Sequence, residues 1–107
     1  MQLQIYQIEN PKYRKNIFDD ASQITHIVAN ANYSNIYFID GSVINVSYNL
    51  KRIERLGKID QTFRRVHKSY IVNCRFIKNF SEDGDRIYLQ NGVVIPVKYF
   101  NANKFLF

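Results

Sequence analysis

The segment from Phe63 to Asn73 carries the side chains that are best suited to binding chemistry. It reads FRRVHKSYIVN, so apolar residues that can anchor it in a core are interleaved with hydrogen-bond donors. The donors are Arg64, Arg65, His67, Lys68 and Ser69. Donors of these types bind phosphate oxygens and the acceptor atoms on base edges. We therefore predict a surface here that binds phosphates and bases.

Catalysis and metal binding have little support in the sequence. The two histidines, His26 and His67, are far apart and do not form the spaced pair that places two metal ligands on one helix face. A zinc site needs about four ligands, whereas Cys74 is the single cysteine and fits a buried or half-buried residue better than a reactive thiol. The acidic run at 82–85 lacks the ligand series of a calcium loop. We expect a protein that is not an enzyme, with no cofactor, no metal and no small-molecule substrate.

The positive charge is concentrated in one part of the chain. The sequence has 15 Lys and Arg against 9 Asp and Glu, a net charge of +6. Residues 51–78 hold nine basic and two acidic side chains, a net charge of +7, whereas residues 1–47 carry −1. Such a stretch favours a polyanionic partner, with nucleic acid first and an anionic membrane second. A solubilising surface is the alternative interpretation.

Length and composition indicate one domain in the cytoplasm. A chain of 107 residues suits a single modest core, so we expect one domain over residues 1–107. One cysteine excludes an internal disulfide framework. No apolar run approaches the ~20 residues of a membrane-spanning helix, and no signal peptide opens the chain.

β-Branched and aromatic residues outnumber good helix formers, which predicts a chain rich in sheet. The Asp40-Gly41 and Asn91-Gly92 pairs each separate two strand-like runs, as in tight hairpins. Pro96 cannot donate to a ladder, so its strand should be an edge or carry a bulge. The predicted strands are residues 3–9, 24–28, 33–39, 42–48, 76–81, 86–90 and 93–97.

One segment has the period of a helix. Leu50, Ile53 and Leu56 share one face, Asn49 suits the N-cap and Gly57 suits the end. Further short helices are expected over 69–73 and 99–105. The residues predicted to form the core are Phe63, Val66, Ile71, Val72, Phe76, Ile87 and Ile95.

The 63–73 segment resembles the signature of the LytTR domain, the DNA-binding output domain of many bacterial response regulators. Other landmarks of that family occur in order: Asn32-Tyr33 before a strand, Asp40-Gly41 in a hairpin, Asn49-Leu50 at a helix start, and Asn91-Gly92 ahead of Ile95-Pro96-Val97. The resemblance covers about residues 24–104. It implies a mainly β fold of about ten short strands in small antiparallel sheets, with two or three short helices.

The resemblance also implies sequence-specific binding of duplex DNA in transcription regulation, with loops placed in successive major grooves. The implied contacts lie in three loops, which contribute Asn32, Tyr33 and Ser34; His67 and Lys68, with Arg65 nearby; and Lys98 and Asn101. Arg64 and Arg75 are expected to support these contacts on the DNA backbone. Two residues depart from the family pattern: Tyr33 stands near a position that is basic or histidine in many members, and Lys98 replaces an arginine.

Partners and context follow from the same resemblance. Family members usually bind paired direct repeats, so we expect a second copy to lie head-to-tail on the DNA and no membrane partner. A receiver domain does not fit into residues 1–23, so the chain is either free-standing or the output domain of a longer response regulator. An RNA- or protein-binding basic module, without sequence-specific DNA recognition, is the alternative function.

Overall fold

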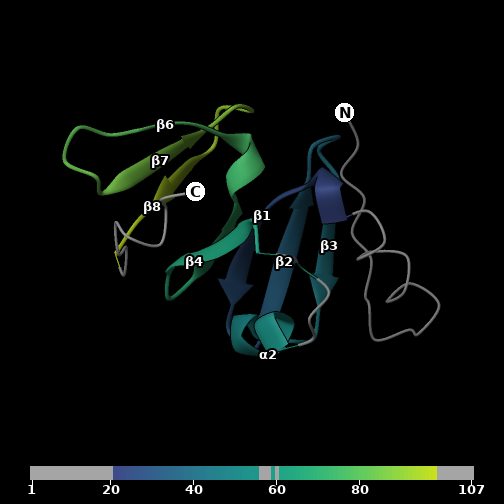
Figure 1. Ribbon diagram of the computed structural model, residues 1–107. Helices are drawn as coiled ribbons and strands as arrows, with labels where there is room; N and C mark the ends of the chain where they lie inside the picture. The colour runs from purple at the N-terminus through teal and green to yellow at the C-terminus, as the bar shows by residue number, and fades with distance from the viewer. Residues whose placement is uncertain (1–20, 56–58, 60, 99–107) are drawn as a thin grey trace.

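The computed structural model describes residues 21–55, 59 and 61–98 of the chain. The described elements are η1 (Ala21–Gln23), β1 (Ile24–Asn30), β2 (Tyr33–Phe38), β3 (Val43–Val46), α2 (Leu50–Arg55), β4 (Phe63–His67), β5 (Tyr70–Asn73), η2 (Cys74–Phe76), β6 (Ile77–Phe80), β7 (Arg86–Leu89) and β8 (Val94–Pro96). The strands form two antiparallel sheets, in the orders β3-β2-β1-β5-β4 and β6-β7-β8 (Figure 1). The predicted mainly β fold is confirmed, with eight strands in the described ranges.

The predicted hairpins form where the sequence placed their turns. Asp40 accepts hydrogen bonds at Oδ1 from the backbone N–H (2.8 Å) and the hydroxyl (2.6 Å) of Ser42, and these bonds lower the pKa of its carboxyl group. At the turn between β7 and β8, Gly92 has a φ of 90°, which suits a residue without a Cβ. Pro96 ends β8, an edge strand of the smaller sheet, as expected.

The expected helix over residues 69–73 is wrong. This segment is β5, which pairs with β1 on one side and with β4 on the other, so its consecutive β-branched residues favour the strand. The helical turn starts only at Cys74, where the Asn73 side chain accepts a hydrogen bond from the Arg75 N–H (3.1 Å). The predicted strand at 3–9 and helix at 99–105 lie outside the described residues.

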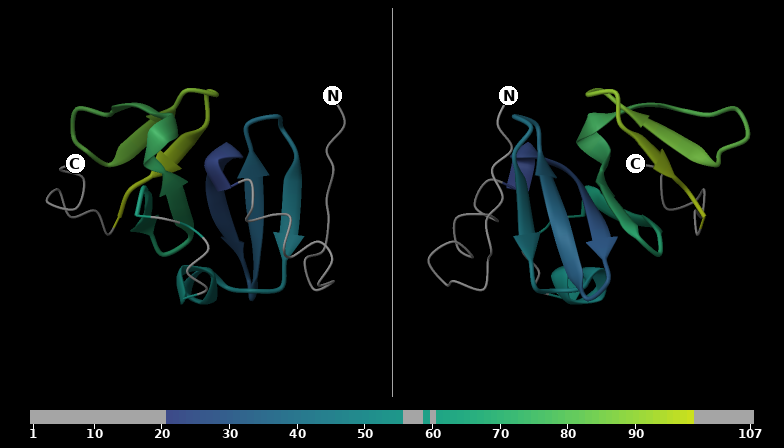
Figure 2. Two further views of the ribbon diagram at one scale, coloured as in Figure 1. Left: turned by 45° about the vertical axis from the view of Figure 1, so that its right-hand side comes forward. Right: turned by 180° about the vertical axis from the view of Figure 1, so that it is seen from behind.

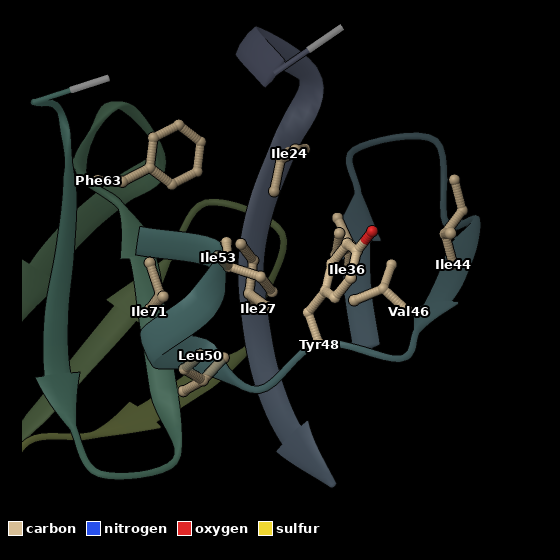
Figure 3. Packing of buried hydrophobic residues seen from close by; sticks show 10 residues of the cluster. All are labelled: Ile24, Ile27, Ile36, Ile44, Val46, Tyr48, Leu50, Ile53, Phe63 and Ile71. Atoms are coloured by element: carbon tan, nitrogen blue, oxygen red, sulfur yellow. The ribbon is translucent and has the colours of Figure 1, made fainter. Parts of the chain in front are cut away.

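The main core lies between one face of the five-stranded sheet and α2. Leu50 and Ile53 of α2 are buried, and Ile27, Ile36 and Ile71 come from the strands behind them (Figure 3). The predicted helix is thus confirmed, and apolar burial attaches it to the sheet.

A second core joins the two sheets. It contains Val66 and Val72 from the β4–β5 hairpin and further residues from the smaller sheet and the chain after it: Ile87, Leu89, Ile95 and Val97. Of the predicted core residues, Phe76 alone is only half-buried, and it lies in η2, the helical turn that follows β5. Figure 2 shows the β4–β5 hairpin between β1–β3 and the smaller sheet. None of the helices in the described ranges has the length and apolar character of a membrane span.

Candidate nucleic-acid interface

Two of the predicted contact loops meet at one end of the five-stranded sheet. Val28 of β1 pairs with Tyr70 of β5, and the Ala29 N–H donates to the Ser69 carbonyl over 2.8 Å. The turn after β1 and the turn between β4 and β5 are therefore neighbours. The helix α2 lies at the same lower end of the sheet (Figure 1).

A bulge in β4 brings the third predicted region to the same place. The pairing shifts between Arg65 and His67, so Val66 is an extra residue whose side chain is buried in the second core. The Val66 carbonyl accepts a hydrogen bond from the backbone N–H of Lys98 over 3.0 Å. The exposed Lys98 thus lies beside the turn that holds His67 and Lys68.

The partly exposed side chain of Arg65 holds the β4–β5 turn. Its Nε donates to the His67 carbonyl (3.0 Å) and its Nη2 donates to the Lys68 carbonyl (2.7 Å). Its Nη1 forms an ion pair with Oε1 of Glu54 on α2, also at 2.7 Å. Three different nitrogen atoms of one guanidinium therefore fix the turn to the helix.

His67 is fixed in one neutral tautomer. Its Nδ1 accepts a hydrogen bond from the Ser69 N–H over 3.0 Å, so in the neutral ring the proton is on Nε2. The ring meets Tyr70 edge to face, with 5.4 Å between centroids. Desolvation, followed by the nearby charges of Lys98, Lys68 and Arg65, lowers the pKa of His67. A neutral imidazole with Nε2–H is a donor suited to the acceptor atoms of DNA.

The turn after β1 presents two of its three predicted contact residues. Asn32 is exposed and Tyr33 is 44% exposed. Ser34 is fully buried, and its hydroxyl donates to the Tyr48 carbonyl over 2.7 Å. The expected contact between Ser34 and DNA does not fit this burial, because alternation along β2 turns its side chain toward the core.

Arg64 and Arg75 lie away from this edge. The Arg64 Nη1 donates to the carbonyls of Gln61 and Phe63, at the far end of the hairpin. Arg75 is exposed on the helical turn after β5, which lies at the opposite end of the sheet (Figure 1). Burial raises the pKa of the half-buried Cys74 to about 11, against the opposing charge of Arg64. The remaining predicted residue, Asn101, lies outside the described residues.

The sequence interpretation missed three cations of α2 as contact candidates. Lys51, Arg52 and Arg55 are exposed and, with Asn32, line one hollow at the same end of the sheet. The signal was present, because the helical period puts them opposite Leu50 and Ile53. They also belong to the segment with a net charge of +7.

The two histidines of the described residues lie in different surroundings, and neither belongs to a cluster of metal-binding side chains. No group of three or more His, Cys, Asp or Glu side chains among the described residues could hold a metal ion. His26 is buried, stacks on Tyr37 with 4.4 Å between ring centroids, and lies 2.8 Å from the Thr25 hydroxyl at Nδ1. Burial lowers the pKa of His26 to about 4, so this ring is neutral and structural at pH 7.

Comparisons with known proteins show the family and the fold of the chain. Residues 14–105 match the family described as the LytTr DNA-binding domain. Among solved structures, the chain is similar to the LytTr DNA-binding domain of a protein described as a methyl-accepting/DNA response regulator from Bacillus cereus. The TM-score is 0.63 at 23% sequence identity, over 73% of this chain and 72% of that chain, which establishes a shared fold. A search of curated proteins found no match.

Proposed function

Because the chain belongs to the LytTR family of DNA-binding domains, we propose that it binds duplex DNA sequence-specifically and regulates transcription in a bacterial cytoplasm. The observation that carries this proposal is the meeting of Asn32, Lys68 and Lys98 from three separate segments at one end of the larger sheet. Contact residues from three neighbouring segments can lie along a duplex, with the turns in its grooves.

The proposed contacts divide into those that read bases and those that bind the DNA backbone. The β4–β5 turn enters a major groove with His67 and Lys68, which donate to acceptors such as guanine O6 and N7. Asn32 and Tyr33 enter from the neighbouring turn, and Lys98 binds beside His67. Arg65 acts as a positioning residue, since its guanidinium already holds two carbonyls of the turn and Glu54.

The proposed target is a pair of direct repeats, with a second copy of the chain head-to-tail on the DNA. The family resemblance supports this arrangement. The contact residues also lie at one end of one sheet, so one copy of the chain can bind one half-site. A second half-site then needs a second copy.

A second candidate function is the binding of single-stranded RNA. The observation that favours it is Tyr33, whose side chain is 44% exposed beside Asn32 and could stack on an unpaired base. Single-stranded RNA would bind the same basic surface as duplex DNA, but its binding would not require the turns to fit a duplex groove.

Selection from a random duplex pool tests the proposal. We expect enrichment of a short motif, repeated in one orientation, and an affinity that falls with salt. Binding that is tight but indifferent to sequence would contradict sequence-specific recognition. Single-stranded RNA that outcompetes the selected duplex at equal salt would favour the second function instead.

A further inference from the structure

A hollow of about 640 Å³ lies beside the turn after β1. Asn32 forms one side of it, and the segment after β3 and the exposed face of α2 form the others. Its lining residues are Asn32, Ser47, Tyr48, Asn49, Lys51, Arg52 and Arg55. Three of these described residues are cations and none is acidic, so the hollow suits an anion.

Arg52 is held in place within this hollow. Its guanidinium carbon lies 4.4 Å from the centroid of the Tyr48 ring, which is a cation–π contact. Tyr48 is 6% exposed, and its carbonyl accepts the hydrogen bond from the buried Ser34. A guanidinium that rests on a fixed ring loses less freedom when it binds an oxyanion.

The acidic residue of α2, Glu54, is already part of an ion pair. Glu54 forms its ion pair with Arg65, and the same arginine holds the β4–β5 turn. The negative charge of Glu54 is thereby matched by Arg65, and the hollow keeps its positive character. The Arg52 N–H already donates a hydrogen bond to the Asn49 side chain over 2.9 Å, so this backbone group is occupied. The positive charge of the hollow therefore comes from its cationic side chains.

We propose that this hollow holds one phosphate of the DNA backbone, outside the groove that the turns enter. The inference rests on the proposed function. Asn32 connects the hollow to the turn that is proposed to enter the groove, because it belongs to that turn and also lines the hollow. The phosphate oxygens accept hydrogen bonds from Arg52, with Lys51 and Arg55 adding charge. The DNA footprint then extends from the turns onto α2.

The test compares Arg52→Gln with a matched control in the full chain. Lys78→Gln removes the same charge from an exposed position on β6, in the other sheet. Each variant is titrated with a duplex recovered by selection and with a scrambled duplex of equal length, over a range of salt. A second set of selected duplexes carries one neutral methylphosphonate at a time. Arg55→Gln repeats the test at an exposed residue, should the Arg52 variant fail to fold.

We expect Arg52→Gln to weaken binding of both duplexes about five- to tenfold and to reduce the salt slope by about one. One methylphosphonate position should weaken the wild type and Lys78→Gln but leave Arg52→Gln unaffected. Wild-type affinity and slope in both α2 variants, with Lys68→Ala still impaired, would overturn the inference and leave the proposed function intact. Failure of the wild type to bind any duplex would overturn both.

Discussion

At the scale of single residues, Lys68 and Arg65 have neighbouring positions but different roles. Lys68 is exposed at the tip of the β4–β5 turn, whereas Arg65 lies behind it with its guanidinium on the turn carbonyls. The sequence motif brings them together as one basic cluster. In the structure, the bulge at Val66 lies between the residue that holds the turn and the residue that is exposed at its tip.

Lys68→Ala should reduce discrimination between target and non-target DNA. Loss of a base contact costs about 1–3 kcal/mol on the preferred site and much less on scrambled DNA. Affinities for the selected and scrambled duplexes check this, with thermal unfolding as the control for folding. Equal affinity and equal discrimination in a folded variant would remove Lys68 from the contacts.

Arg65→Gln should weaken binding to the selected duplex while leaving the salt slope unchanged, because the turn loses its support and no phosphate contact is lost. Arg65→Lys should fail to restore binding, since an ammonium group cannot replace a guanidinium that donates from three nitrogens. The measurement is affinity against salt for both variants. A slope reduced by about one, with recovery in the lysine variant, would indicate a direct phosphate contact instead.

At the scale of elements, the hairpins, the α2 helix and the edge position of β8 could be predicted from the sequence. Their signals are local: Asp40-Gly41, the period of Leu50 and Ile53, and Pro96. The error at β5 has a physical cause, since four residues between β1 and β4 take their structure from pairing with both neighbours. The burial of Ser34 could not be predicted for a similar reason, because it depends on which face of β2 meets the core.

His26, which lies at the contact between β1 and β2, should make the stability of the fold depend on pH. The pKa of His26 is lowered from 6.5 to about 4 in the folded chain. As pH falls from 6.5 toward 4, the unfolded chain takes up a proton that the folded chain does not. The free energy of unfolding should therefore fall by up to about 1.4 kcal/mol per pH unit from this group.

The variant His26→Gln isolates this effect. Glutamine does not titrate, so the stability of the variant should depend less on pH between 6.5 and 4. Denaturant unfolding of both proteins across this range gives the comparison. Parallel pH profiles would show that His26 does not carry the loss of stability.

At the scale of the whole molecule, charge alone does not define the interface. The segment with a net charge of +7 predicts a polyanionic partner. The described residues of this segment nevertheless lie in different parts of the molecule: Lys68 and the α2 cations lie at one end of the larger sheet, and Arg75 lies at the other end (Figure 1). Distances along the sequence cannot reveal this division, because the direction of each strand determines it.

Arg75→Gln should therefore change DNA affinity far less than Lys68→Ala does, although it removes the same charge. Binding to the selected duplex at two salt concentrations provides the comparison. A loss as large as that of Lys68→Ala would mean that the DNA runs across η2, and the proposed edge would need revision.

The proposed interface is tested most directly by a titration of the ¹⁵N-labelled chain with the selected duplex, followed by amide chemical shifts. We expect the largest changes on the two neighbouring turns and the chain after β8, at Asn32, Tyr33, His67, Lys68 and Lys98. Amides of β6 and β7 should move little. Changes concentrated on β6 and β7, with the turns unaffected, would contradict the proposed interface.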